Sequence, residues 1–214
     1  MFLECKNLRR NLSDFSLDVS FGVEENHMAS LVGPSGSGKS TVLSMIAGLV
    51  HPDKLSDTKI ILDNKDITYL EPGKRECGMV FQNPSLFLNM NVVDNVAYGL
   101  VCRGMKKKDA RSKAEMFLEK FNMAGFSKRS PETLSGGEAQ RVALARTLIV
   151  QPKLVLFDEP LSALDTELRK KLAQEIRSMQ RTIPFTAIMV THDLDEAVSI
   201  SDEVIHIEKG RIRD

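Results

Sequence analysis

A glycine-rich stretch near the start of the chain has the residue types and spacing of a phosphate-binding loop. It reads Gly33-Pro34-Ser35-Gly36-Ser37-Gly38-Lys39-Ser40-Thr41, between an apolar run at 28–32 and an apolar helical pattern at 41–49. Glycines let successive backbone N–H groups point at one anion, and the following helix presents its positive dipole end. Lys39 supplies a point charge, and the Ser40 hydroxyl suits the magnesium ion that accompanies a nucleotide. We therefore expect a nucleotide site here.

Two acidic residues and a histidine follow two further apolar runs. Asp158 and Glu159 come after the run at 153–157, and His192 comes just after the run at 186–190. Unbroken apolar runs of this length are typical of parallel strands buried on both faces, and open α/β sheets bind ligands at the carboxyl ends of such strands. A magnesium nucleotide needs one carboxylate for the metal and another to orient or deprotonate water. These side chains are therefore candidates for chemistry beside the glycine loop.

The segment 134–149 combines a helix signal with an unusual helix start. Ser135 can cap the helix. The expected apolar face of this helix comprises Val142, Ala145, Leu148 and Ile149. Gly136 and Gly137 in the first turn would normally weaken the helix, because glycine is a poor helix former. They fit a helix start that closely approaches another backbone or an anion, but an ordinary capped helix explains the segment equally well at this stage.

Composition and charge are those of a globular protein with no general attraction to nucleic acid. Of the 214 residues, 42% are hydrophobic and 27% are charged, and 29 basic residues balance 29 acidic ones. No apolar run approaches the roughly 20 residues that span a bilayer, and the N-terminus lacks the layout of a secretion signal. Cys5, Cys77 and Cys102 are widely spaced and match no metal-ligand pattern. We expect them to be reduced cytosolic thiols.

The order of strand and helix patterns predicts an α/β fold with two parts. Alternation at 15–23 indicates an antiparallel strand, whereas the chain beyond about residue 85 has helical texture. Within that helical region, residues 110–121 have helical spacing, with Gly125 as the expected stop. We expect a single domain over 1–214, made of a nucleotide-binding core with a β subdomain at 1–84 and 150–214 and a helical subdomain at 85–149.

Together these motifs resemble the ATP-binding cassette (ABC) ATPases over nearly the whole chain. Six elements occur in the order and approximate spacing that are typical of that family. They are the phosphate loop, Gln82, the signature at 134–138, the Asp158-Glu159 pair, the segment 162–165 and His192. The signature separates this family from other phosphate-loop ATPases. The resemblance implies a RecA-like parallel-sheet core, an antiparallel β subdomain, an inserted helical signature subdomain, and ATPase activity with ATP and Mg²⁺ as cofactors.

The resemblance also assigns roles in binding the nucleotide. The loop amides and Lys39 are expected on the β- and γ-phosphates, and Thr41 is expected near the α-phosphate. Ser40 and Asp158 are expected to hold magnesium. Gln82 resembles the family's metal- and water-sensing residue, which links hydrolysis to a partner protein.

Catalysis and assembly follow from the same resemblance. Glu159 resembles the general base for the attacking water, and His192 resembles the switch residue that contacts the γ-phosphate. The family forms head-to-tail dimers, here expected to be homodimers, in which residues 135–137 of each copy cover the γ-phosphate held by the other copy. Asp165 is expected near the dimer seam. ATP would then hold two subunits together until hydrolysis releases them.

Two segments, 87–100 and 190–197, narrow the resemblance to the ATPase subunits of importers. In that class the segment after Gln82 forms part of a groove that receives a short cytoplasmic helix of a membrane permease. The candidates for apolar contacts in this groove are Phe81, Leu86, Phe87 and Met90, of which about half are expected to pack the helical subdomain instead. The implied partners are permease subunits and, through them, a solute-binding protein. The implied location is the cytoplasmic face of the cell membrane.

Two departures from the family pattern bear on the site. The family usually stacks adenine on an aromatic ring in the stretch corresponding to 8–13, which contains none here, so Arg10 and Phe15 are the alternatives. Glu138 replaces the more usual glutamine of the signature and should leave the helix start intact.

Other functions would use the same catalytic residues. An exporter or lipoprotein-release subunit would share all of them. A cassette ATPase that acts on nucleic acid is a more distant alternative, because such proteins usually carry coiled coils or basic extensions, which this sequence lacks. The cargo, the direction of transport and the choice between homodimer and heterodimer are open at this stage, since transported substrates contact other subunits.

Overall fold

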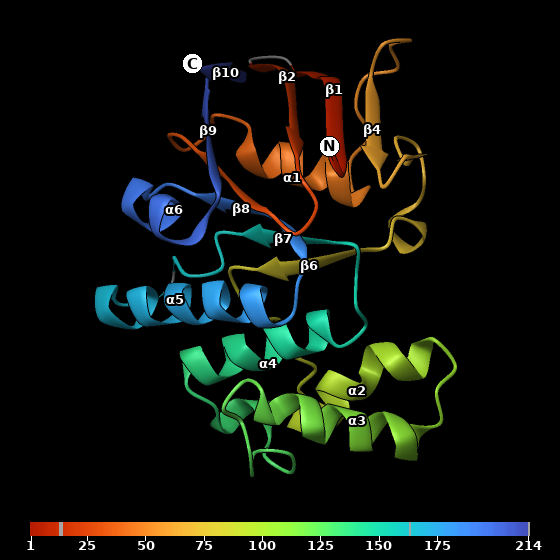
Figure 1. Ribbon diagram of the computed structural model, residues 1–214, viewed down its shortest axis with the longest axis vertical. Coiled ribbons are helices and arrows are strands. Elements are labelled where there is room, and N and C mark those ends of the chain that lie inside the picture. Colours follow the sequence, from red (N-terminus) through yellow and green to blue (C-terminus); the bar gives the residue numbers. More distant parts are fainter. Residues whose placement is uncertain (13–14, 163, 214) are drawn as a thin grey trace. The chain divides into compact units, whose positions relative to one another are not determined.

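The computed structural model describes residues 1–12, 15–162 and 164–213, so Ser13 of the expected adenine-stacking stretch and Ala163 of the 162–165 segment lie outside the described residues. Four strands near the N-terminus form an antiparallel sheet in the order β2-β1-β4-β5 (Figure 1). They are β1 (Leu3–Leu12), β2 (Phe15–Val23), β4 (Lys59–Leu62) and β5 (Lys65–Asp66). Buried residues alternate with exposed ones along the first half of β2, which confirms the strand that the alternating sequence predicted.

A second, mostly parallel sheet has the order β10-β9-β3-β8-β7-β6. Its strands are β3 (Met28–Val32), β6 (Cys77–Phe81), β7 (Leu154–Asp158), β8 (Thr186–Thr191), β9 (Glu203–Glu208) and β10 (Arg211–Arg213). Strands β3, β7, β8 and β9 pair in parallel, whereas β10 pairs with β9 in the antiparallel sense. Every residue of β3 and β8 is buried, as the unbroken apolar runs predicted.

The helix that follows the glycine loop, α1 (Lys39–Ala47), lies between the two sheets (Figure 1). Its inward-facing residues join one apolar core with both sheets. That core includes Leu8 of β1, Leu17 of β2, Ile46 of α1 and Ile188 of β8. Gly48 ends the helix in the left-handed conformation, with φ of 81°.

The side chain of Arg75, which lies just before β6 in the sequence, is buried against the C-terminal end of α1, and only 1% of the residue's surface is exposed. Its guanidinium donates to the carbonyl oxygens of Met45 and Ile46 in the last turn of the helix, at 2.7 and 3.0 Å. It also donates to the carbonyl oxygens of Leu70 and Thr68, at 2.7 and 2.8 Å. A cation at this end of a helix is favourable because the C-terminal carbonyls carry partial negative charge. Arg75 therefore joins α1 to the segment that leads into β6.

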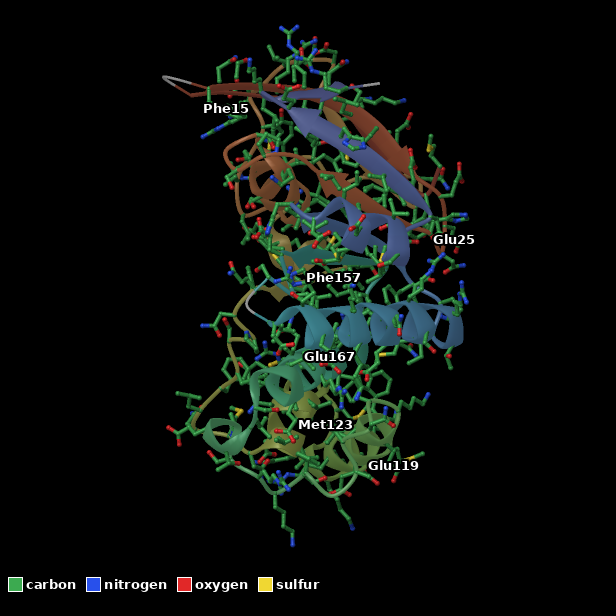
Figure 2. The ribbon with its side chains drawn as sticks, turned by 90° about the vertical axis from the view of Figure 1, so that its left-hand side faces the viewer. Phe15, Glu25, Glu119, Met123, Phe157 and Glu167 are labelled. Atoms are coloured by element: carbon green, nitrogen blue, oxygen red, sulfur yellow. The ribbon has the colours of Figure 1, made fainter. Side chains whose placement is uncertain are left out.

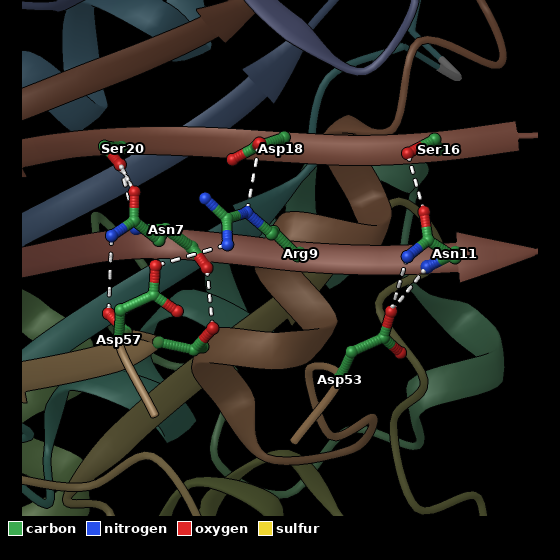
Figure 3. A network of polar contacts seen from close by, with 9 residues as sticks. Asn7, Arg9, Asn11, Ser16, Asp18, Ser20, Asp53 and Asp57 are labelled. Carbon is green, nitrogen blue, oxygen red and sulfur yellow. Dashed lines mark hydrogen bonds and ion pairs between the residues drawn. The ribbon is translucent and has the colours of Figure 1, made fainter. Parts of the chain in front are cut away.

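Polar side chains on β1 hold the segment 51–58, which follows α1, against the antiparallel sheet (Figure 3). The guanidinium of Arg9 bridges Asp18 of β2 at 3.0 Å and Asp57 at 3.2 Å. Nearer the end of β1, the backbone and side-chain N–H groups of Asn11 both donate to Asp53, at 2.9 and 3.1 Å. These contacts fix the end of β1 that leads into β2.

Helices dominate the middle of the chain. Helix α2 (Val92–Cys102) packs against α3 (Lys107–Glu119) and α4 (Gly136–Leu148). The expected stop of the helical segment at Gly125 is wrong, because α3 ends at Glu119 and the chain turns at Asn122, whose φ is 56°. The remaining helices are α5 (Thr166–Thr182), α6 (Leu194–Ile200) and the 3-10 turns η1 (Pro72–Lys74) and η2 (Pro131–Thr133).

The chain divides into two compact units. The first, called here the core unit, comprises Met1–Met79, Lys153–Glu159 and Ala173–Asp214, and the second, the helical unit, comprises Val80–Pro152 and Pro160–Leu172. Within the described ranges, every helix is too short or too polar to cross a lipid bilayer. The phosphate loop and the two strand ends with candidate chemistry all belong to the core unit, so their geometry can be described together.

Candidate functional site

The glycine loop leaves the end of β3 and enters α1 directly. Gly33 lies so close to β9 that a Cβ atom there would be 2.0 Å from the carbonyl oxygen of Ile207, so only glycine fits. Gly38 precedes the helix with φ of 103°, a conformation that residues with side chains rarely adopt. A Cβ at Gly38 would also meet the ring of Phe15 at 2.8 Å. These two glycines thus allow the loop to pack tightly between β9 and β2.

The ammonium group of Lys39 lies within the loop. It donates to the carbonyl oxygens of Gly33 and Pro34, at 2.8 and 2.9 Å, and approaches the hydroxyl of Ser37 at 3.4 Å. Burial lowers the pKa of Lys39 below its ordinary value, and the nearby carboxylates of Glu159 and Asp158 partly oppose that shift. The partners of the Lys39 ammonium group within hydrogen-bonding distance are neutral oxygens. The group can therefore exchange them for phosphate oxygens, which bind a cation more strongly.

Strand register brings the candidate catalytic residues to the same sheet edge as the loop. Val32 pairs with Thr191, and Asp158 pairs with Val190, so the carboxyl ends of β3, β8 and β7 lie side by side. The Ser40 hydroxyl donates to the Asp158 carboxylate at 2.9 Å across this edge. The sequence-based expectation that the strand ends meet is therefore confirmed.

The hydroxyl and carboxylate oxygens of Ser40 and Asp158 are the kind of ligand that Mg²⁺ prefers. Protein sites for Mg²⁺ with nucleotides usually supply only one or two such groups, and phosphates and water complete the shell. No group of three or more His, Cys, Asp or Glu side chains suited to a metal ion occurs in the part of the chain that the structure describes. A site that relies on a bound nucleotide for its other ligands needs only one or two such protein groups, so Ser40 and Asp158 fit the ion.

Glu159 turns the chain sharply at the end of β7. Its φ is 46°, in the left-handed region, and its backbone N–H donates to the carbonyl oxygen of Val190 at 3.1 Å. This conformation is uncommon for a residue with a side chain and often marks a functional position. The carboxylate lies 3.3 Å from Nδ1 of His192, whose side chain is about half exposed. Sequence patterns carried no sign of the unusual backbone.

An open hollow of about 280 Å³ lies over the loop. Its lining residues are Phe15, Ser35, Gly36, Gly38, Lys39, Ser40, Thr41 and Glu159. Phe15 belongs to this lining and stands at the start of β2 (Figure 2). Arg10, the other alternative for stacking on a base, donates to the carbonyl oxygen of His51 at 3.0 Å and pairs with Asp53 at 3.8 Å. The structure therefore places Phe15 beside the phosphate loop and Arg10 in contact with the segment after α1.

The signature helix α4 begins as its sequence predicted. Ser135 caps the helix, and Glu138 completes a capping box by accepting from the backbone N–H of Ser135 at 2.7 Å. Glutamate at this position thus leaves the helix start intact. A Cβ added at Gly136 or Gly137 would meet its nearest described neighbours, which are leucine side chains, at 3.4 Å or more. These neighbours within the same chain therefore give no reason for the two glycines.

The other expected site residues also belong to the helical unit. Gln82 follows β6 directly and is exposed. Asp165 is exposed at the start of α5, where its carboxylate accepts from the backbone N–H groups of Glu167 and Leu168, at 3.1 and 2.9 Å. Among the predicted residues, the core unit thus brings together the loop, Asp158, Glu159 and His192, and the helical unit holds Gln82, Asp165 and the signature.

The glycine loop leads directly into a helix, and a hydroxyl, two carboxylates and a histidine lie beside it at the edge of a parallel sheet. This arrangement defines a phosphate-loop nucleotide-binding protein. Residues 17–162 match the sequence profile described as ABC transporter. The chain belongs to the ABC transporter family.

Individual relatives agree with that assignment. The chain is 46% identical over 209 residues to "Fe(3+) ions import ATP-binding protein FbpC" of Agrobacterium fabrum, covering 97% of this chain and 58% of the relative. It is 47% identical over 195 residues to "Fe(3+) ions import ATP-binding protein FbpC 1" of Rhizobium meliloti, covering 91% of this chain and 54% of the relative. The chain thus spans a little over half the length of these curated relatives.

The fold resembles a solved structure at full length. CbiO1 from Clostridium perfringens, described as part of the ABC transporter complex cbiONQ, superposes with a TM-score of 0.88 at 28% sequence identity. The match covers 100% of this chain and 87% of the CbiO1 chain. The phosphate-loop fold that the sequence predicted, with its antiparallel N-terminal sheet, is thereby confirmed.

Proposed function

We propose that the protein is the ATP-binding and ATP-hydrolysing subunit of an ABC transporter. The observation that carries the proposal is one edge of the parallel sheet, where a phosphate loop, a hydroxyl–carboxylate pair and a glutamate–histidine pair come together. These groups would supply a grip on phosphate, a place for magnesium and a base for water. Membership of the ABC transporter family supports the same reading.

The binding roles follow from the chemistry of each group. Lys39 and the loop amides bind the β- and γ-phosphates, and Thr41, which lines the hollow, lies near the α-phosphate. Ser40 and Asp158 hold Mg²⁺ when the nucleotide is bound. The ion would supply positive charge that neutralises the phosphate oxygens.

Glu159 acts as the general base for the attacking water. A carboxylate at the end of a parallel strand, beside the lysine that holds phosphate, is positioned to take a proton from water near the γ-phosphate. His192, 3.3 Å from that carboxylate, keeps it oriented and contacts the γ-phosphate. The left-handed backbone of Glu159 supports this role, because such uncommon backbone conformations cluster at active sites.

Phe15 supplies the stacking surface for adenine. It lines the same hollow as the residues expected on the phosphates. Arg10 is already engaged by the His51 carbonyl and Asp53, so stacking through its guanidinium would cost those contacts. An aromatic face accepts any base, so this choice favours binding strength over selectivity between purines.

The second half of the nucleotide site comes from another copy of the chain. A Cβ atom at Gly136 or Gly137 would make only ordinary contacts with its described neighbours, so the glycines are better explained by the approach of an anion to the N-terminus of α4. Residues 135–137 therefore cover the γ-phosphate held by a second, head-to-tail subunit, with Asp165 near the seam. Gln82 senses the metal and water and links hydrolysis to the permease.

A permease in the cell membrane is the partner that uses the ATPase, with the subunit bound to the cytoplasmic face. Import is the proposed direction, because the relatives are named as import proteins, and a ferric-ion permease with its solute-binding protein is the first candidate to test. Phe81 is 41% exposed and is the strongest candidate for the permease contact. The ring centroid of Phe87 lies 4.8 Å from that of Tyr98 and 5.2 Å from the guanidinium carbon of Arg146, so Phe87 packs within the helical unit.

Replacing Glu159 with glutamine tests the proposal. Glu159→Gln should nearly abolish ATP hydrolysis, keep ATP binding and trap a dimer, because the base is lost while the phosphate grip remains. Size-exclusion chromatography with Mg²⁺ and ATP, together with phosphate release, measures both effects. Ser135→Arg in the same background is the matched control and should give an ATP-bound monomer. Persistent turnover in the first variant would refute the role of Glu159, and a dimer of the double variant would refute the role of the signature.

A further inference from the structure

The turn between β9 and β10 makes backbone hydrogen bonds to two parts of the nucleotide site. The N–H of Gly210 donates to the carbonyl oxygen of Ser37 in the phosphate loop at 3.2 Å. The carbonyl oxygen of Gly210 accepts from the N–H of Asp18 in β2 at 2.8 Å. One peptide segment near residue 210 therefore links the loop that would hold phosphate with the strand that begins at Phe15.

Both the conformation and the space at this position require glycine. The φ of Gly210 is 77°, which a residue with a side chain adopts only under strain. A Cβ there would lie 2.0 Å from the carbonyl oxygen of Ser16 and 3.1 Å from Cα of Leu17. These obstacles are backbone atoms of β2, so they cannot be cleared by rotating a side chain. The turn and β2 therefore stay in contact only while residue 210 is glycine.

A second close approach holds the other end of the phosphate loop. Gly33 faces the carbonyl oxygen of Ile207 in β9, at a distance that also excludes a Cβ atom. The strand β9 and its turn thus support the loop from Gly33 to Ser37. The site residues Glu159 and His192 follow β7 and β8, which lie on the opposite side of β3 from β9 in the sheet.

We propose that Gly210 is a positioning residue for ATP, which sets the place of the phosphate loop relative to the base-stacking strand. The inference rests on the proposed ATP-binding function and assigns a role to the C-terminal turn. A nucleotide has a fixed length between its base and its terminal phosphates, so both must find their partners at once. Displacement of one reacting or binding group by about 1 Å can cost on the order of 100-fold in function. A direct backbone link between the two surfaces prevents that displacement.

Substitution of Gly210 should affect the binding of ATP, measured by KM, and leave the hydrolysis step, measured by kcat, almost unchanged. Gly210→Ala forces β2 away from the turn, or the turn away from the loop, and so weakens the hold on ATP. The base and the histidine lie on the other side of β3 and keep their places. We therefore expect the KM for ATP to rise about tenfold or more while kcat stays within about twofold. A merely structural role would reduce the amount of folded protein, which lowers the apparent kcat and leaves KM unchanged.

Gly125→Ala is the matched control. Gly125 has φ of 81°, so alanine suffers the same backbone strain there, but a Cβ atom would meet nothing within 4 Å. Steady-state hydrolysis with Mg²⁺ and ATP should show the rise in KM only for the residue 210 variant. Equal KM values in the wild type and the Gly210→Ala variant would overturn the inference. Failure of the wild-type protein to bind ATP at all would instead overturn the proposed function.

A measurement on the unaltered protein covers the case in which Gly210→Ala fails to fold. If the turn positions ATP, ATP binding must in turn stabilise the hydrogen bonds of the turn, because the two equilibria are linked. Amide hydrogen exchange of Gly210 and Asp18 should therefore slow by about tenfold or more when Mg²⁺ and ADP saturate the protein. The amides of α3, in the helical unit, serve as the internal reference. Exchange at Gly210 that is unchanged by the nucleotide would refute the link.

Discussion

Replacing Arg75 with methionine should destabilise the core unit strongly, although Arg75 lies outside the nucleotide hollow. Methionine has a similar length and fills most of the same space, so the change removes the charge and its donors rather than the packing. Four carbonyl oxygens then lose a hydrogen bond from a guanidinium, two of them in the last turn of α1. The partial negative charge at the end of that helix also loses its counterion.

The magnitude can be worked from these bonds. A hydrogen bond to a charged group contributes roughly 1.5–3 kcal/mol, so four such bonds give roughly 6–12 kcal/mol before opposing effects. Burial holds the pKa of Arg75 below its ordinary value, which reflects the cost of desolvating the charge, and methionine avoids that cost. We therefore expect a net loss of about 4 kcal/mol in the free energy of unfolding. For a chain of this size, that corresponds to a fall in the unfolding midpoint of about 8–16 °C.

Thermal unfolding followed by circular dichroism measures the effect. Lys74→Met is the control, since Lys74 carries the same charge one residue earlier, pairs only with Glu71 in the described structure and is 70% exposed. Its loss should cost less than about 0.5 kcal/mol. Arg75→Lys should recover part of the stability, because an ammonium group still supplies three donors. A fall in midpoint no larger than that of Lys74→Met would show that the four carbonyl contacts do not stabilise the fold.

Two further predictions concern the nucleotide and acid. Phe15→Ala should weaken ATP binding by about 5- to 150-fold and leave the affinity for inorganic tripolyphosphate unchanged, as calorimetry can show, whereas Arg10→Ala should affect neither. Asp94 and Asp202 each accept hydrogen bonds from an arginine, and these bonds hold the pKa of each carboxyl below its ordinary value. The charged carboxylates therefore stabilise the folded state fully above about pH 4, the ordinary pKa. That stabilisation is lost as the pH falls through the folded-state pKa. Urea unfolding should therefore show a free energy that drops as the pH falls below about 4, with a smaller drop in the Asp94→Asn and Asp202→Asn double variant.

Much of the site could be predicted because its residues follow local rules. The loop around Lys39 is recognisable from spacing alone, since the glycines, the lysine and the hydroxyl act through adjacent backbone groups. The capping box of Ser135 and Glu138 spans one turn of helix. Parallel strands place their carboxyl ends at one edge, so the sequence alone predicts Asp158 beside the glycine loop that holds Ser40.

Other features depend on contacts between distant parts of the chain. Arg75 looks like a surface residue in sequence, because two of the four carbonyls that receive it come from a helix about thirty residues earlier. Nothing near Gly210 in the sequence indicates that its N–H reaches Ser37. The left-handed turn at Glu159, which local propensity would not favour, is accompanied by a backbone hydrogen bond to Val190 in β8, more than thirty residues away in sequence. The choice between Phe15 and Arg10 also required the placement of both side chains around the hollow.

The capping box of α4 has a consequence for electrostatics at the start of that helix. Hydrogen bonds from the backbone and hydroxyl of Ser135 hold the pKa of Glu138 below its ordinary value, so its carboxylate is charged throughout the physiological range. A fixed anion therefore sits where the helix dipole would otherwise be fully open to an incoming phosphate. Any anion that docks there meets attraction from the backbone N–H groups and repulsion from Glu138 together. Glutamine at this position would keep the hydrogen bonds from Ser135 and remove the repulsion, so in the proposed dimer this side chain would tune how readily a docked phosphate departs.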